Sequence, residues 1–274
     1  NLISMKKTTL VMFLMLFCIA CFSQSTIRAS LGYGIPLNAD VIMVQVREGY
    51  DGSFYRKVKG IYGSYGSGFR FNIAFARPIK KGSSFSWDIE NTLVLGKKYV
   101  NRSIYNNGVE TPERTETRSL AYQVSPSLVC GFKWKSLTPY VRIGPTLSFA
   151  KLITNVRLLT TNFLEVEYSY EYKGGVGLGM KSVIGTAMQI APKLSLVGEI
   201  SFLSMTYGPK KGWLTKYDVE DSSELDQFSK KERTIKFEKE YTITPDDSEA
   251  QTVNTRSRYA MGSVSLNLGM KFTF

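Results

Sequence analysis

The chain has 274 residues, with 35 Lys and Arg against 23 Asp and Glu, a formal net charge of +12, and no histidine. Histidine is the side chain that most often acts as a general base near neutral pH, and it is a common zinc ligand. We therefore expect neither an ordinary hydrolase nor a zinc protein. A net positive charge of this size favours binding to nucleic acid if the protein is soluble, and to an anionic lipid surface if it is exported.

The first part of the chain is typical of a secretory signal peptide. Residues 1–4 precede Met5, which we take as the initiator, and two lysines lead into the apolar run Leu10–Phe22. Such a run is in the range of signal peptides and is shorter than the roughly 20 residues that a membrane-spanning helix needs. We predict a signal peptide over residues 1–23, cleaved before Gln24, and one domain over residues 24–274.

Two other interpretations of this leader stay open. Cys21 could be the acylated residue of a lipoprotein, although Cys18 stands where the lipoprotein motif normally has leucine, and the apolar run could remain uncleaved as an anchor. With cleavage at the predicted position, only Cys130 remains. The mature chain could then form no internal disulfide.

The rest of the chain alternates apolar and polar residues in long segments, as β-strands with two unlike faces do. We predict eight such strands, at residues 26–38, 62–78, 84–99, 119–135, 139–152, 172–190, 194–207 and 258–274. Tight turns are expected around residues 80–83, 136–138 and 191–193, and longer connections at 39–59, 100–118, 153–170 and 208–257. We expect Val41–Val46 and the 153–170 connection to extend strands beyond the others, and 100–118 to be a polar loop.

The last segment, Arg258–Phe274, is the most regular. Its apolar face carries Val264, Leu266, Leu268, Met270 and Phe272, and its polar face carries Ser265, Asn267 and Lys271. A soluble protein that ends on such a strand leaves a sticky edge, whereas a closed barrel pairs that edge with its first strand. We expect this strand to pair with residues 26–38, with its apolar face toward lipid. A soluble sandwich or lipocalin-like barrel, with the apolar face inside, is the alternative.

Three features favour a membrane barrel over the soluble alternative. The segments reach the 9–11 residues that cross a bilayer at a tilt, and short and long connections alternate, as in outer-membrane barrels. Aromatic residues near segment ends fit interfacial girdles: Trp87, Tyr99, Trp134, Tyr140, Tyr207 and Phe272. The predicted fold is all-β, an eight-stranded antiparallel transmembrane β-barrel with up-and-down meander topology behind an N-terminal signal peptide.

With its leader, its strand pattern, its phenylalanine ending and segments such as TPYVRIGPTLSF (residues 138–149), the chain resembles the small bacterial outer-membrane β-barrel family of the OmpA/OmpX-like type. Within that type it is most similar to the Bacteroidetes outer membrane protein β-barrel domain and PorT-like proteins. The resemblance covers the whole mature chain and includes no catalytic or ligand motif. It implies the outer membrane of a Gram-negative bacterium, and it implies little about activity.

Charged residues fall on the predicted inner face, where a narrow lumen would bury them. They are Arg70, Asp88, Glu90, Lys133, Arg142, Lys181, Glu199 and Lys271. Buried charges must pair, so we expect a plug of ion pairs, with Lys271 partnered by an inward carboxylate. A narrow conduit with a slight anion preference is the alternative, because basic residues outnumber acidic ones.

Catalysis and cofactor binding are not expected. The small outer-membrane barrels that are enzymes use His-assisted mechanisms. A Ser–Lys or a carboxylate mechanism stays open, and the nearest residues for a Ser–Lys pair are Lys271 with Ser263 or Thr273. The glycine runs at 63–68 and 174–179 lack the following helix that a phosphate loop needs. The acidic stretch 218–226 does not have the spacing of an EF-hand calcium loop. We expect no cofactor and no metal.

The function predicted from these features is that of an integral outer-membrane protein with a structural or interaction role carried by its long outer loops. A small-solute porin, or an accessory barrel subunit of a secretion or envelope machine, is the alternative. The expected partners are outer-membrane lipid and lipopolysaccharide, the barrel-assembly machinery, for which Phe272 and Phe274 would form the C-terminal signal, and a protein or host ligand bound by loop 208–257. Nucleic acid is not expected.

Overall fold

The structure is a computed structural model that describes residues 25–37, 40–50, 54–80, 82–106, 110–160, 164–238, 252–255 and 258–274. The leader predicted over residues 1–23 and its cleavage site lie outside these ranges. The described residues form strands and turns with one short 3-10 helix, η1 (Leu225–Gln227). No helix among them is long and apolar enough to cross a membrane.

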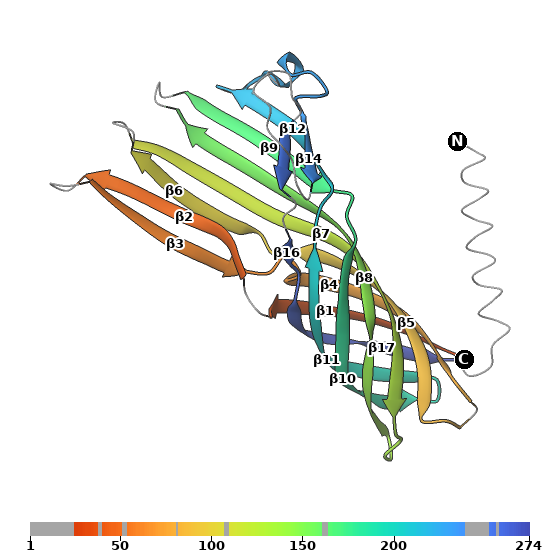
Figure 1. Cartoon of the computed structure of the whole chain (residues 1–274). Helices are drawn as coiled ribbons and strands as arrows, with labels where there is room; N and C mark the ends of the chain where they lie inside the picture. The colour runs from red at the N-terminus through yellow and green to blue at the C-terminus, as the bar shows by residue number, and fades with distance from the viewer. Residues whose placement is uncertain are drawn as a thin grey trace.

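Eight strands pair edge to edge into a closed antiparallel barrel, seen at the lower right of Figure 1. They are β1 (Thr26–Pro36), β4 (Gly68–Pro78), β5 (Phe85–Gly96), β7 (Glu110–Gly131), β8 (Leu137–Leu159), β10 (Gly177–Ala191), β11 (Leu194–Tyr207) and β17 (Ser263–Thr273). Each pairs with the barrel strands before and after it. β17 closes the ring on β1, from Thr26 opposite Thr273 to Pro36 opposite Ser263. The predicted strand number, meander topology and closing pair are confirmed.

The two faces of the barrel differ as the alternation predicts. On β17, Leu266 and Leu268 are 60% and 65% exposed on the outside, whereas Ser265 and Asn267 are each 2% exposed inside. An eight-stranded barrel has room inside only for side chains, and here those side chains are mostly polar. The apolar face therefore points outward, and the soluble sandwich or lipocalin-like arrangement is wrong for this chain.

Short and long connections lie at opposite ends of the barrel. The described residues 79–80 and 82–84, 132–136 and 192–193 lie in the short turns, at the end where β1 begins and β17 finishes. We call this the turn end. At the other end β7 and β8 continue past the ring: β7 pairs with β5 over Leu120–Cys130 and with β6 over Glu110–Thr117.

These continuations form an open sheet, which we call the extension, and it fans toward the upper left of Figure 1. Its strand order is β3-β2-β6-β7-β8-β9-β12-β14-β15. The added strands are β2 (Asp40–Tyr50), β3 (Phe54–Gly63), β6 (Tyr99–Asn106), β9 (Glu165–Lys173), β12 (Lys211–Val219), β14 (Thr234–Glu238) and β15 (Thr252–Thr255). Two short strands complete the description: β13 (Ser222–Ser223) pairs with β12, and β16 (Tyr259–Ala260) pairs with the end of β11.

The extension confirms some expectations and corrects others. Val41–Val46 lies in β2, and the 153–170 connection forms the end of β8 and most of β9, as predicted. The connection 100–118 is wrong as a loop, because β6 and the first part of β7 pair there. The connection 208–257 likewise contains β12 to β15.

Two smaller expectations fail near the strand ends. β7 finishes at Gly131, so Phe132, Lys133 and Trp134 lie exposed in the turn and do not continue the strand. The strand predicted at residues 62–78 begins only at Gly68, which has a φ of +130°. Gly66 lies before it, in the turn between β3 and β4. A Cβ on Gly66 would lie 1.9 Å from the carbonyl oxygen of Met261. This position therefore requires glycine because two backbone segments meet there.

Candidate functional site

The middle of the lumen holds a network of charged side chains drawn from five barrel strands. Its members are Arg28, Asp88, Glu90, Arg142, Lys181 and Glu199, each at most 7% exposed. They come from β1, β5, β8, β10 and β11 and share the inward parity of their strands. Burial removes water as a partner, so these groups must satisfy one another.

Glu90 is the centre of this network. Its Oε2 accepts from Arg28 Nη2 at 2.8 Å and from Arg142 Nη1 at 2.7 Å, and its Oε1 accepts from Lys181 Nζ. One carboxylate therefore contacts three cations, which come from three other strands.

Asp88 and Glu199 bind the same two arginines. Asp88 lies 3.2 Å from Arg28 Nη2 and 3.1 Å from Arg142 Nη1. Glu199 Oε1 lies 3.2 Å from Arg28 Nη1 and accepts from the Tyr140 hydroxyl at 2.6 Å. This hydrogen bond adds Tyr140 to the network as an uncharged member. The two guanidinium groups thus bridge three carboxylates across the lumen.

The predicted charge cluster is only partly assembled. Asp88, Glu90, Arg142, Lys181 and Glu199 meet in the network. Arg70 is buried but contacts no carboxylate; it donates to the carbonyl oxygen of Gly66 at 2.7 Å and to the Ser263 hydroxyl.

Lys271 and Lys133 depart from their predicted roles. Lys271 faces the lumen near the turn end, but it makes no ion pair with any carboxylate of the described residues, so the expected partner is missing. Lys133 is wrong as a lumen residue, because it is exposed in the turn that follows β7.

Sequence reasoning missed two members of the network. Arg28 lies two residues before Ser30 on β1, and both side chains are buried in the lumen, so strand parity was sufficient to include it. Tyr140 was assigned to an interfacial girdle, yet it points inward to Glu199. Tyr99 and Tyr207, given the same assignment, are buried in an apolar cluster, so the girdle prediction is wrong for all three.

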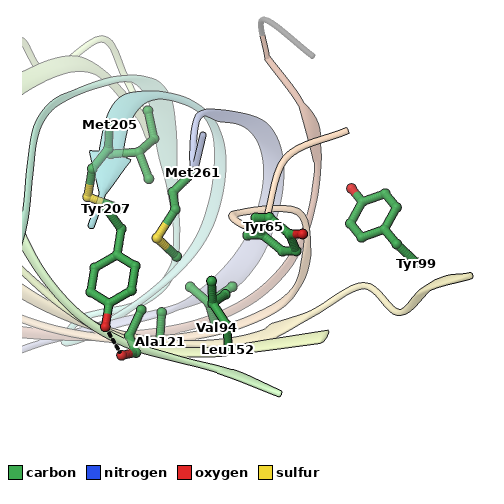
Figure 2. Close-up of a cluster of buried hydrophobic side chains, with 10 residues drawn as sticks. Tyr65, Val94, Tyr99, Ala121, Leu152, Met205, Tyr207 and Met261 are labelled. Atoms are coloured by element: carbon green, nitrogen blue, oxygen red, sulfur yellow. Dashed lines mark hydrogen bonds between the residues drawn. The ribbon is translucent and has the colours of Figure 1, made fainter. Parts of the chain in front are cut away.

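That apolar cluster fills the lumen at the end nearest the extension (Figure 2). It comprises Tyr65, Val94, Tyr99, Ala121, Ala150, Leu152, Leu203, Met205, Tyr207 and Met261. Leu152, Tyr207 and Met261 are at most 1% exposed, and the Tyr207 hydroxyl donates to the Ala150 carbonyl at 2.6 Å, the dashed line of Figure 2. We call this cluster the plug, because it separates the charged network from the extension.

The turn end, by contrast, contains a cavity of about 200 Å³. Arg28, Asp88 and Tyr140 of the network reach its wall, together with Lys271 and the hydroxyl-bearing Thr26 and Ser86. The lumen is therefore filled at its middle and at its extension end and hollow at its turn end.

The extension has two unlike faces. One face carries ion pairs. Three join neighbouring strands, Arg157 with Glu165 at 3.0 Å, Lys216 with Glu167 at 2.7 Å and Lys151 with Glu171 at 2.6 Å, and one lies within β7, Arg114 with Glu116 at 2.6 Å. The hydrogen bond from Lys98 lowers the pKa of Glu116, and the one from Lys216 lowers the pKa of Glu167. We call this the ion-pair face.

The opposite face is rich in tyrosine. Tyr168, Tyr170 and Tyr172 follow one another at every second position of β9, with ring centroids 5.6 Å and 6.0 Å apart. Tyr172 also contacts Phe237 of β14 at 5.8 Å. We call this the tyrosine face.

A cavity of about 290 Å³ lies on the tyrosine face where the extension meets the plug. Tyr65, Tyr172 and Tyr259 are its aromatic lining, and Asn101 and Thr117 are among its polar groups. Burial, and next the neighbouring Tyr259, raise the pKa of Tyr65 and of Tyr172, so both hydroxyls stay neutral. The lining includes no charged side chain.

Phe272 and Phe274 lie on the outside at the turn end, 42% and 45% exposed, with ring centroids 5.1 Å apart. The Phe274 amide donates to the carbonyl of Ser25 at 3.0 Å. The part of the chain that the structure describes contains no group of three or more His, Cys, Asp or Glu side chains placed to hold a metal.

The solved structures that are similar to this chain share little sequence with it. No protein-family model matches it, and no curated protein does. Among solved structures it is similar to Neisserial surface protein A, with a TM-score of 0.38 and 10% identity, over 91% of this chain and 97% of that one. It is also similar to Ail, the attachment invasion locus protein of Yersinia pestis, with a TM-score of 0.30 and 12% identity, over 92% of this chain and 100% of that one. The closed barrel itself is established by the strand pairing of this chain.

Proposed function

We propose that the chain is an integral outer-membrane barrel of a Gram-negative bacterium that holds the extension outside the membrane as an interaction surface. The apolar outer face of the barrel would contact membrane lipid and lipopolysaccharide. Phe272 and Phe274 would form the signal read by the barrel-assembly machinery. The partner held by the extension would be a protein or a host ligand.

The observation that carries this proposal is a change of polarity along one face of two continuous strands. On β8, Ile143 and Phe149 are 54% and 50% exposed on the outside of the barrel, and the next outward residue is Lys151, which pairs with Glu171. On β7 the change falls between Leu120 and Arg118, and Leu120 lies opposite Lys151. Adjacent strands thus become polar at one level, as expected where a bilayer ends.

The tyrosine face is the part of the extension that we expect to contact a partner. Aromatic side chains offer large contact areas and are enriched at binding interfaces. Loop 208–257, the predicted carrier of specificity, contributes β12 and β14 to this sheet, and Phe237 of β14 contacts Tyr172. The ion-pair face, with its charges already partnered, suits contact with water.

Cysteine labelling on intact cells would test the orientation. In a Cys130→Ala background, Lys57→Cys places a thiol on β3 of the extension, and Lys133→Cys places one in the turn after β7. A membrane-impermeant maleimide should label the first in intact cells and the second only after the outer membrane is opened. Equal labelling of both in intact cells, or labelling of only the turn, would contradict the proposed placement.

A narrow anion-selective conduit is the second candidate, favoured by one observation: among the described residues, cationic side chains outnumber carboxylates in the lumen. The plug and the network would then have to move for solute to pass. An accessory subunit of an envelope machine remains a third proposal. Capture of a stoichiometric envelope partner in mild detergent would support it, and the absence of that partner would favour the interaction role.

A further inference from the structure

The lumen contains more positive than negative side chains. Among the described residues, Arg28, Arg70, Arg142, Lys181 and Lys271 face it, against Asp88, Glu90 and Glu199. The three carboxylates are all engaged by Arg28, Arg142 and Lys181. Arg70 at least donates to Gly66 and Ser263. Lys271 makes neither an ion pair nor a hydrogen bond of this kind with the described residues, although Asp88 lines the same cavity.

Lys271 lies directly across from another cation. In the β1–β17 pairing, Arg28 is opposite Lys271, and both line the turn-end cavity of about 200 Å³. Like charges opposite each other on one face of a sheet are destabilising. Arg28 Nε, moreover, is buried without a hydrogen-bond partner among the described residues.

The remaining lining of the cavity also fits an anion. Arg77 adds a third cation to the wall. Among the described lining residues Asp88 is the only carboxylate, and it already contacts both network arginines. Thr26 and Ser86 offer hydroxyl donors. Because the plug closes the lumen toward the extension, a solute would reach this cavity from the turn end.

We propose that the turn-end cavity binds a small oxyanion, of the class of inorganic phosphate, between Lys271 and Arg28. The Lys271 ammonium group donates charge-assisted hydrogen bonds to its oxygens, the neighbouring Arg28 guanidinium adds positive charge, and the hydroxyls complete the shell. The bound anion separates two like charges and offsets the positive surplus of the lumen. A volume of about 200 Å³ holds such an ion with water and excludes a lipid or a nucleotide. This inference does not depend on the proposed function, since it concerns the folded barrel in any surroundings.

The test uses the folded full-length protein in a non-ionic detergent. The midpoint of thermal unfolding is followed while phosphate replaces chloride at constant pH and ionic strength. A ligand that binds only the folded state raises this midpoint in a saturable way. Phosphate also strengthens apolar burial in general, so the decisive quantity is the part of the response that Lys271→Gln removes.

We expect a saturable rise in the wild type, its retention in Lys271→Arg, and its loss in Lys271→Gln. Lys133→Gln, which removes an exposed cation at the same end of the barrel, should respond like the wild type. An equal response in Lys271→Gln and the wild type would overturn the proposal. If Lys271→Gln does not fold, equilibrium dialysis of radiolabelled phosphate against the wild type and Lys271→Arg decides, and absence of saturable binding overturns the proposal.

Discussion

In the middle of the lumen, the Glu90 carboxylate contacts Arg28, Arg142 and Lys181 with both of its oxygens. A buried ion pair gains little over a well-packed apolar core, but removing one partner leaves an uncompensated charge. Here one carboxylate is shared by three cations, so its loss leaves all three short of a partner. Glu90 is therefore the residue at which we expect the barrel to be most sensitive.

Glu90→Gln should destabilise the barrel strongly, by about 3–5 kcal/mol if it behaves as other broken buried pairs do. The measurement is the urea midpoint for loss of the compact, fast-migrating form in detergent. Glu116→Gln, which breaks an ion pair on the extension, should cost less than about 1 kcal/mol. Equal midpoints for the two variants would show that the network does not hold the barrel together.

Exposed apolar residues provide a second prediction at this scale. Leu268 on the barrel and Val58 on the extension are 65% and 60% exposed, so accessibility alone does not distinguish them. If lipid surrounds the barrel, Leu268→Lys should cost about 2–4 kcal/mol in a bilayer, because a charge near the midplane is poorly solvated. Val58→Lys should be close to neutral. Similar folding free energies in lipid vesicles would contradict the membrane placement.

At the scale of elements, the barrel and the extension differ in what stabilises them. Surface ion pairs contribute more to the stability of the extension, whereas the closed ring of paired strands stabilises the barrel. The hydrogen bond from Lys98 holds the pKa of Glu116 below its ordinary value of 4.5, and that from Lys216 does the same for Glu167. A lowered pKa in the folded state means that the stabilisation is complete above 4.5 and is lost as pH falls through the lower, folded-state value. Each such surface pair is weak and screened by salt.

Acidification should therefore loosen the extension before the barrel. Between about pH 6 and about pH 3, amide hydrogen exchange in β6 and β9 should speed up, after correction for the intrinsic rate, more than exchange in β11. High salt at pH 6 should produce a smaller change in the same direction. Equal loss of protection in β9 and β11 would mean that the two parts unfold together.

The longest connection offers a deletion at the same scale. Tyr207 pairs with Tyr259 where β11 meets β16, so removing residues 210–256 would leave a short hairpin loop between them. We expect this variant to fold and to keep heat-modifiable migration on a gel, because all eight barrel strands remain. Failure to insert into detergent or lipid would show that β12 and β14 are structural parts of the barrel and do more than carry binding specificity.

For the whole molecule, the plug and the charged network lie in series along the lumen: toward the extension, Val94 of the plug lies beyond Glu90 on β5, and Leu152 lies beyond Arg142 on β8. Leu152, Tyr207 and Met261 are at most 1% exposed, and the side chains of the network are nearly as buried. Ions could cross the lumen only if both the plug and the charged network moved aside. Purified folded protein in a planar bilayer should therefore give no conductance steps at high salt. Reproducible unitary steps, absent from a heat-denatured sample, would instead support the conduit.

Much of the fold was readable from alternation and connection length. The segment 194–207 matches β11 at both ends, and the last segment contains β17 with its faces assigned correctly. The extension was harder to recognise, because residues 110–118 carry polar side chains on both faces of a strand. Such a sequence looks like a loop until its partner strands are known, since only pairing shows that it is extended.

The sequence by itself determined which side chains of one strand share a face, because in a strand this depends only on parity. It could not determine which of them meet. Strands in a barrel are tilted and staggered, so Arg142 of β8 reaches Glu90 of β5 across the lumen although the two strands do not pair. The same geometry brings Arg28 into the network and leaves Lys271 at its turn end without a carboxylate. Parity is a local property of the chain, whereas contact in the lumen depends on closure and stagger, which only the tertiary structure decides.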